Sequence, residues 1–382
     1  MKKILFFCLI GVVLFSSCGA GRKQGQNVEM DSLADESPRY AKGYSVKVLD
    51  NGIRLIDVAD PQDDEEKMPV SYHFALVEKG HEGEVPEGYT KVEVPIERTL
   101  VMTMLQLSNF TALDALDIVR GITGTKNLFN KDIRQRVKDG RIVKIGMEGN
   151  FDTELILAAH PEVIFISPFK RGGYDAIKET GITLIPHLGY KELTPLGQAE
   201  WIRFVGMFIG KEHEADSIFA GIESRYNSLK QKVEDHKSDT KLPTVFSGEM
   251  HGGNWYAVGG KNSLAQIFRD AGAQYVFDND DTGGVNIEFE EMYAAAANAD
   301  YWRILNSYEG DFSYDALKAS EPRNELFKAF KEKKVIYCNM KQTPYYEKSP
   351  VMPDVLLSDL VAIFHPELMP VDYEPTFYRM LK

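Results

Sequence analysis

The chain has 382 residues, and its 57 acidic residues outnumber its 44 basic ones to give a net charge of −13. With 43% hydrophobic and 26% charged residues, the composition excludes a disordered chain and a protein with several membrane spans. The acidic balance argues against a nucleic-acid partner, because nucleic-acid binding needs clustered Lys and Arg. Small molecules and basic protein surfaces are the expected partners.

The first 17 residues have the pattern of a lipoprotein signal peptide. Two lysines follow Met1, and the apolar run Ile4–Phe15 that comes next is too short to cross a bilayer. Small residues then precede Cys18, as in the bacterial lipobox, so Cys18 is the predicted site of lipidation. The alternative is an ordinary secretory signal with an incidental cysteine. A lipid-anchored protein of the bacterial periplasm is therefore expected.

The cysteines predict a fold without disulfides. Cys8 leaves with the signal peptide and Cys18 carries the lipid, so Cys338 is the only free thiol expected in the mature chain. The exported protein must then be stabilised by its hydrophobic core.

After the signal peptide, residues 18–39 are polar and predict a flexible tether. Residues 40–91 are predicted to be a β-hairpin extension. Alternating residues in Tyr44–Val48 and Ile53–Val58 flank Asn51-Gly52, a pair that favours a tight hairpin turn. The stretch 61–88, with its acidic run 63–66, is expected to be rich in loops.

The predicted fold class is α/β, with two lobes at residues 92–193 and 241–382. Short apolar strands alternate with helical segments in both lobes, which argues for parallel sheets covered by helices. The clearest strands are Pro161–Ser167, Ile182–Pro186, Pro243–Ser247 and Val335–Asn339. Residues 194–240 have no strand signal and carry apolar residues at helical spacing, so one long helical connector is expected between the lobes.

Several segments together resemble the periplasmic substrate-binding proteins of ABC importers for iron siderophores, haem and cobalamin. The segments are Phe151–Ile164, Pro195–Trp201, Trp255–Ser263, Asp270–Ala273, Ile287–Trp302 and Phe364–Leu368. Ile287–Trp302 repeats the pattern of Phe151–Ile164, with Ala299 where the family usually has Pro. The resemblance covers about residues 92–370. It implies a monomeric receptor that is not an enzyme, has no cofactor, and delivers an iron chelate, haem or corrinoid to an ABC permease and its ATPase subunits.

Candidate ligand-binding residues lie in loops at strand ends, where α/β sheets present ligand groups. They are Trp255, Tyr256, His251, Met250, Phe169, Lys170, Arg171, Tyr190 and Lys341, with Tyr174, Tyr345, Tyr346 and Lys126 in comparable loops. Aromatic rings suit large flat ligands, and basic groups suit ferric chelates or haem propionates. Each aromatic ring could instead belong to the core. His251 has two open interpretations, a solvent-facing hairpin residue or, together with Met250, a candidate axial haem ligand.

Other chemistry has little support in the sequence. The eight histidines are dispersed without a zinc motif, so no metal is predicted. Gly259–Ser263 lacks the residues of a phosphate loop and predicts instead an Asn or Ser N-cap for a helix over Leu264–Asp270. An exported enzyme that uses the interlobe cleft, and a glycan-binding or adhesion lipoprotein, remain the alternatives.

Glu154 and Glu290 occupy equivalent places in the two lobes, each at the start of a helix that precedes a strand. The helix dipole favours a carboxylate there whatever its role. The resemblance implies that the two glutamates dock onto arginines of the permease subunits.

Overall fold

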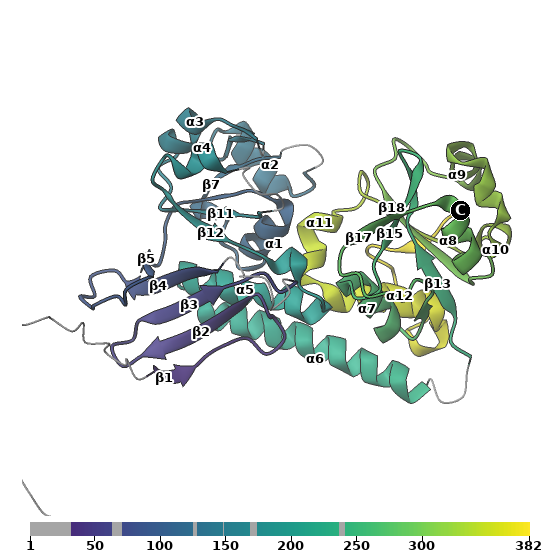
Figure 1. The fold of residues 1–382 in the computed structure, drawn as a ribbon, viewed down its shortest axis with the longest axis horizontal. Helices are drawn as coiled ribbons and strands as arrows, with labels where there is room; N and C mark the ends of the chain where they lie inside the picture. The colour runs from purple at the N-terminus through teal and green to yellow at the C-terminus, as the bar shows by residue number, and fades with distance from the viewer. Residues whose placement is uncertain (1–31, 63–70, 125–127, 148, 169–173, 237–240) are drawn as a thin grey trace, which may run out of the picture. The chain divides into compact units, whose positions relative to one another are not determined.

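The computed structural model describes residues 32–382 with gaps at 63–70, 125–127, 148, 169–173 and 237–240 (Figure 1). Residues Ser32–Lys382 form one compact unit. The predicted signal peptide, Cys18 and the first part of the predicted tether lie outside the described residues. Within the described ranges, no helix combines the length and the apolar character that a membrane crossing needs.

The N-terminal extension is a five-stranded sheet in the order β1-β2-β3-β4-β5, and not a hairpin alone. Its strands are β1 Ser32–Asp35, β2 Tyr44–Leu49, β3 Arg54–Val58, β4 Tyr72–Glu78 and β5 Thr90–Val94. Strands β2 and β3 pair antiparallel as the hairpin that the sequence predicts. Strand β4 lies inside the stretch expected to be loops. It buries four consecutive residues, so it lacks the alternation that marks a half-buried strand.

Two buried carboxylates hold the start of this extension, so the predicted tether 18–39 does not extend as far as residue 39. Glu200 accepts hydrogen bonds from the backbone N–H groups of Arg39, Tyr40 and Ala41 at 2.9, 2.7 and 2.9 Å. Glu192 accepts one from the backbone of Gly43 at 2.9 Å. Strand β1, which lies within the predicted tether, is also part of the sheet, because it pairs antiparallel with β2.

The first lobe contains a parallel sheet in the order β12-β11-β6-β7-β8, as the sequence predicts. Its strands are β6 Thr99–Val101, β7 Val119–Ile122, β8 Val143–Lys144, β11 Val163–Ile166 and β12 Thr183–Pro186, with the short pair β9 Gly146–Met147 and β10 Asn150–Phe151. Its helices are α1 Met104–Ala112, α2 Lys131–Lys138, α3 Thr153–Ala158 and α4 Asp175–Lys178. Strand β11 is buried along its whole length, which explains its unbroken apolar sequence.

The second lobe has a sheet in the order β16-β13-β18-β19-β20, parallel except for β20. Its strands are β13 Thr244–Ser247, β16 Gln274–Tyr275, β18 Tyr301–Asn306, β19 Val335–Asn339 and β20 Arg379–Met380. A smaller antiparallel sheet joins β14 Glu249–His251, β15 Asn254–Val258 and β17 Gly284–Ile287. The helices are α7 Ser263–Asp270, α8 Phe289–Ala296, α9 Tyr314–Ser320, α10 Lys328–Lys331, α11 Tyr345–Lys348 and α12 Pro353–Phe364. Asn262 caps α7, as predicted.

The connector consists of two helices rather than one, α5 Pro195–Ile209 and α6 Glu212–His236. Gly210 ends α5 in the left-handed conformation with φ of 68°, a conformation that glycine adopts without steric cost. Almost every residue of α5 is buried, whereas α6 buries one face, which includes Phe219, Ile222 and Tyr226. Helix α6 packs against α5 and α12, and Figure 1 shows it extending from one to the other.

Candidate functional site

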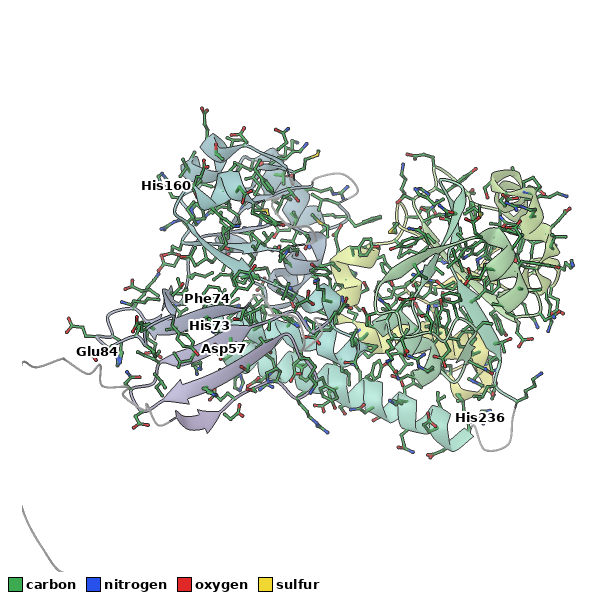
Figure 2. The ribbon with its side chains drawn as sticks, in the orientation of Figure 1. Asp57, His73, Phe74, Glu84, His160 and His236 are labelled. Atoms are coloured by element: carbon green, nitrogen blue, oxygen red, sulfur yellow. The ribbon has the colours of Figure 1, made fainter. Side chains whose placement is uncertain are left out.

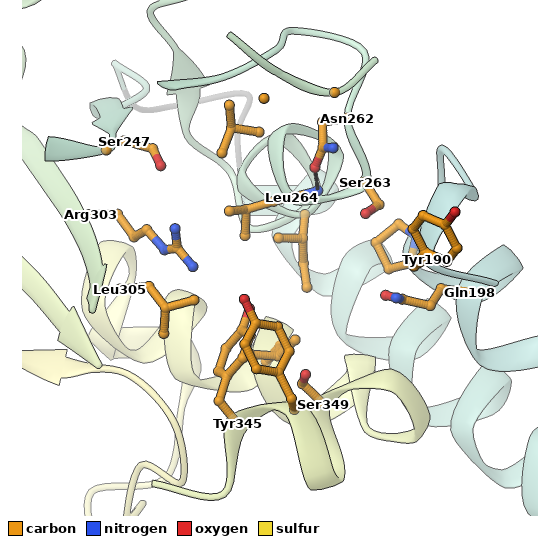
Figure 3. A pocket seen from close by; sticks show the side chains of 18 of the residues that line it. Tyr190, Gln198, Ser247, Asn262, Ser263, Leu264, Arg303, Leu305, Tyr345 and Ser349 are labelled. Carbon is orange, nitrogen blue, oxygen red and sulfur yellow. Dashed lines mark hydrogen bonds between the residues drawn. The ribbon is translucent and has the colours of Figure 1, made fainter. Parts of the chain in front are cut away.

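A cavity of about 980 Å³ lies where the carboxyl ends of β13 and β18 face α7, α11 and the start of α5 (Figure 3). Most of its lining residues come from the second lobe. Leu105 of α1, Tyr190 and Gln198 contribute the opposite wall, and Gln62 reaches it from the N-terminal extension. The carboxyl ends of parallel strands are the usual place for ligands in α/β sheets.

Arg303 supplies a buried positive charge to this cavity. It lies on β18 and is 6% exposed. Its Nε and Nη2 atoms donate to the Tyr378 hydroxyl at 3.0 and 2.6 Å. Among the described residues, no carboxylate lies within salt-bridge distance of the Arg303 guanidinium, and no group accepts a hydrogen bond from its Nη1 atom. Because arginine stays protonated in proteins, this charge needs an anionic partner.

Two hydroxyl groups complete a donor cluster beside Arg303. Ser247 is the residue opposite Arg303 on neighbouring β13, and its Oγ is buried with no hydrogen-bond partner in the part of the chain that the structure describes. The Tyr378 hydroxyl accepts from Arg303, so its proton is donated to the Tyr345 oxygen, 3.1 Å away. The Tyr345 proton is then free for a further acceptor, and Figure 3 shows Ser247, Arg303 and Tyr345 along one wall of the cavity. The cluster can donate at least three hydrogen bonds to one anionic group.

One carboxylate shares this wall. Glu249 lies on β14, where it accepts a hydrogen bond from Asn306 Nδ2 at 3.2 Å. Burial raises the pKa of Glu249, which favours the neutral acid. The positive charge of Arg303 acts against this rise, so Glu249 is an acidic group on the cavity wall that interacts electrostatically with Arg303.

Three of the predicted ligand-binding residues lie on the cavity wall, Tyr190, His251 and Tyr256. Tyr345 and Tyr346 lie there as well. His251 is an exposed residue of the β14–β15 hairpin and also lines the cavity, so both of its interpretations agree with its position.

Trp255 does not lie on the cavity wall. Its indole is fully buried against Phe246, Trp302 and Phe327, and its Nε1 donates to the Ser247 carbonyl at 3.1 Å. Along β15, Trp255 faces the core and Tyr256 faces the cavity, since adjacent strand residues point to opposite faces. Tyr256 is therefore the residue of this pair that lines the cavity.

Three other candidates lie off the cavity. Met250 packs against the core that holds Trp255. Lys341 forms an ion pair with Glu309, and Tyr174 is buried with its hydroxyl donating to the Ser167 carbonyl at 2.8 Å. Phe169, Lys170, Arg171 and Lys126 lie outside the described residues.

Glu154 and Glu290 are both exposed in the first turns of α3 and α8. Asp152 caps α3 as predicted, by accepting from the Leu155 N–H at 3.0 Å. Glu290 pairs with Arg323 at 3.0 Å, and Glu154 has no ion pair among the described residues.

Sequence reasoning missed Arg303 and Ser247. A signal for Arg303 was present, since it is the one charged residue within the strand Tyr301–Asn306. A charge in a buried strand needs a reason. Ser247 carries no comparable signal, because only the register of β13 against β18 places it beside Arg303.

Known proteins share both the sequence pattern and the fold. The family model described as "Periplasmic binding protein" matches residues 103–341. The uncharacterized lipoprotein MJ0878 of Methanocaldococcus jannaschii is 28% identical over 294 residues, which cover 74% of this chain and 68% of the relative. The uncharacterized lipoprotein MJ0872 of the same organism is 23% identical over 322 residues, which cover 82% of this chain and 81% of the relative.

Solved structures of low sequence identity share the two-lobe fold. A periplasmic heme binding protein from Pseudomonas aeruginosa superimposes with a TM-score of 0.59 at 16% identity, covering 75% of this chain and 98% of its own. The TroA-like periplasmic binding protein FepB from Veillonella parvula superimposes with a TM-score of 0.55 at 18% identity, covering 75% of this chain and 95% of its own. The molybdate periplasmic binding protein MolA of a Haemophilus influenzae ABC transporter superimposes with a TM-score of 0.54 at 16% identity, covering 72% of this chain and 87% of its own.

The family match spans more than half of the chain, and the parallel sheets, the helical connector and the cavity between them agree with it. The chain belongs to the periplasmic binding protein family.

Proposed function

We propose that this protein is the lipid-anchored periplasmic receptor of an ABC importer, and that it captures an anionic iron chelate or haem in the interlobe cavity. The observation that carries the proposal is the buried guanidinium of Arg303, which faces the cavity with no carboxylate of the described residues within salt-bridge distance. The unpartnered Oγ of Ser247 supports it, since a buried hydroxyl without a partner is costly. An anionic oxygen group would satisfy both residues.

The size and composition of the cavity favour a large ligand. Binding pockets for drug-sized molecules have volumes of about 300–1,000 Å³, and this cavity reaches about 980 Å³. Tyr256 and Tyr346 give it aromatic faces, and Leu264, Leu305 and Leu356 add apolar contacts. A corrinoid would fit the same space but gains less from Arg303. The similar structures include a heme binding protein and a molybdate binding protein, so the family alone selects no ligand.

Direct titration tests the receptor. The absorbance spectrum of protein purified without metal supplements is recorded first, followed by titration with haem, ferric hydroxamate, ferric catecholate and cobalamin. We expect saturable one-to-one binding of an iron ligand. A Soret band that changes in His251→Ala would assign haem with His251 as an axial ligand.

Arg303→Met tests whether Arg303 binds the anionic group of the ligand. Lys341→Met is the matched control, because it also removes one positive charge, at a residue that does not line the cavity. A hydrogen bond to a charged group contributes about 1.5–3 kcal/mol, so Arg303→Met should weaken binding by tenfold to a hundredfold. Equal dissociation constants in wild type and Arg303→Met would contradict the anion site.

The other two functions make different predictions for the same samples. An exported enzyme would convert the bound compound to a product that mass spectrometry detects. A glycan-binding lipoprotein would bind oligosaccharides in an array and ignore the iron compounds. The receptor should do neither.

A further inference from the structure

Two histidines and one glutamate meet at the C-terminal end of α6, and none of them lines the cavity. His236 is the last residue of α6, and Figure 2 labels it there. His365 caps the end of α12, and Glu367 lies in the 3₁₀ turn η6 Pro366–Leu368 that follows. One ligand atom from each of the three side chains lies within 4.8 Å of the other two.

The hydrogen bond of His365 to the backbone fixes which of its ring nitrogens can bind a cation. His365 Nε2 lies 3.1 Å from the Gly272 carbonyl oxygen. A carbonyl oxygen only accepts, so Nε2 carries the proton and donates it. In the neutral ring Nδ1 then presents a lone pair, and it faces Glu367 Oε1 at 3.7 Å. Metal-binding histidines commonly donate their second N–H to a backbone carbonyl in this way.

The surroundings of the three side chains also favour a cation. A lone pair and a carboxylate oxygen that face each other repel, and either a proton on the ring nitrogen or a metal ion bound to both atoms removes this repulsion. The same Glu367 Oε1 lies 2.8 Å from His236 Nε2. Helices α6 and α12 both end here, and the C-terminal end of a helix attracts positive charge.

Spacing and exposure fit a metal ion. Donor atoms around a tetrahedral zinc at about 2.0–2.1 Å are about 3.3 Å apart. The distances of 2.8 and 3.7 Å from Glu367 lie on either side of that spacing, so small side-chain rotations suffice. His365 is 5% exposed, whereas Glu367 is 53% exposed, so an ion can reach the group from solvent and keep water as its remaining ligand.

We propose that His236, His365 and Glu367 form a binding site for one divalent metal ion of the zinc type. Imidazole with carboxylate is a donor set that suits zinc and its neighbours in the transition series. The ion would join the end of α6 to the end of α12, because the two histidines come from different helices. The site is independent of the ligand cavity and does not rest on the proposed transport function.

The test uses chelator-treated protein in the His251→Ala background, which removes the cavity histidine as a competing ligand. Zn²⁺ is titrated by calorimetry, and the melting temperature is measured with and without Zn²⁺. We expect one high-affinity site and a rise in melting temperature, since an ion that binds only the folded state stabilises it. Co²⁺ should give the intense visible absorbance of a tetrahedral site.

The variants are His236→Ala and Glu367→Gln, both near the surface, with His213→Ala as the matched control because His213 is an exposed histidine of the same helix. Loss of one ligand should weaken Zn²⁺ binding by about 100-fold, since outer-shell changes alone cost about 10–100-fold. His213→Ala should bind normally. The proposal is overturned if no Zn²⁺ binds to the starting protein, or if both variants retain its affinity and its Co²⁺ spectrum.

Discussion

Adjacent residues of β15 have opposite environments, and the sequence alone does not separate them. Trp255 is fully buried, whereas Tyr256 is 52% exposed on the cavity wall. Trp255→Ala should therefore destabilise the fold by about 3–5 kcal/mol, the usual cost of removing a large buried aromatic side chain. Tyr256→Ala should leave stability within about 1 kcal/mol and weaken ligand binding.

Urea unfolding and ligand titration on both variants distinguish the two roles. If Trp255→Ala unfolds like wild type and loses affinity, the indole contacts the ligand and our assignment of it to the core is wrong.

His187 is a buried histidine that predicts acid sensitivity. Its ring packs against Trp201 at 4.7 Å between centroids, and burial lowers the pKa of His187 to about 3. The ordinary value is 6.5, so between pH 6.5 and 3 the unfolded chain binds a proton that the folded chain does not. The free energy of unfolding must then fall as the pH decreases through this range, by about 2 kcal/mol at pH 5 from this residue alone.

His187→Gln keeps an acceptor for Asn109 Nδ2, which lies 3.3 Å from His187 Nε2, and removes the titration. Urea unfolding at pH 7 and pH 5 should show a smaller loss of stability in His187→Gln than in wild type. His213→Gln, an exposed control, should behave like wild type. Equal losses in all three proteins would assign the acid sensitivity elsewhere.

Helices and strands could be predicted where local residues determine them. Strands β11, β13 and β19 are short apolar runs, and Asn262 is a strong N-cap, so all four features were identifiable. Strand β1 was not, because its pairing with β2 determines it. The break at Gly210 could not be predicted, because a glycine inside a helical pattern can either continue the helix or end it. Only the structure shows its positive φ, which ends α5.

One of the two buried carboxylates that hold the start of the N-terminal sheet, that of Glu200, lies on α5. Glu200 accepts three backbone N–H groups, from Arg39, Tyr40 and Ala41. An amide at this position turns one acceptor into a donor, and each unsatisfied buried group costs about 1–3 kcal/mol. Glu200→Gln should therefore lower the free energy of unfolding by about 2–4 kcal/mol and speed hydrogen exchange at these amides.

Glu223→Gln is the matched control for Glu200→Gln. Glu223 binds the same segment through the side chains of Arg39 and Tyr40, each at 2.6 Å, and it is partly exposed. Glu223→Gln should lower the free energy of unfolding by less than about 1 kcal/mol, since partly exposed ion pairs usually contribute no more than that. Similar effects of the two changes would show that the buried backbone contacts contribute little.

At the scale of the whole molecule, Glu154 is exposed in the first turn of α3 in the first lobe, and Glu290, with Glu291 beside it, is exposed in the first turn of α8 in the second. We propose that Glu154 and Glu290 dock onto arginines of the permease. Exposed interface charges set association rate and orientation, so Glu154→Arg with Glu290→Arg should abolish stimulation of the importer ATPase and keep ligand affinity within about twofold.

Glu214→Arg is the matched control, because Glu214 is an exposed glutamate in the first turn of α6. It should support full transport with the cognate importer. Full transport by the double variant would reject the docking role. A parallel loss of ligand affinity would place these carboxylates in the binding site or the fold instead.

The anion site that we propose at Ser247, Arg303 and Tyr345 has a consequence for unloading. Ser247, Arg303 and Tyr345 all belong to the second lobe, whereas the first lobe adds Leu105, Tyr190 and Lys191 to the cavity, and Lys191 is already paired with Asp60. A ligand held by these three donors would stay on the second lobe even if the lobes separated. Delivery is then an exchange reaction, in which the acceptor must offer the anionic group new partners before Arg303 releases it. The spontaneous dissociation rate of the free receptor would therefore underestimate the rate at which the importer receives its substrate.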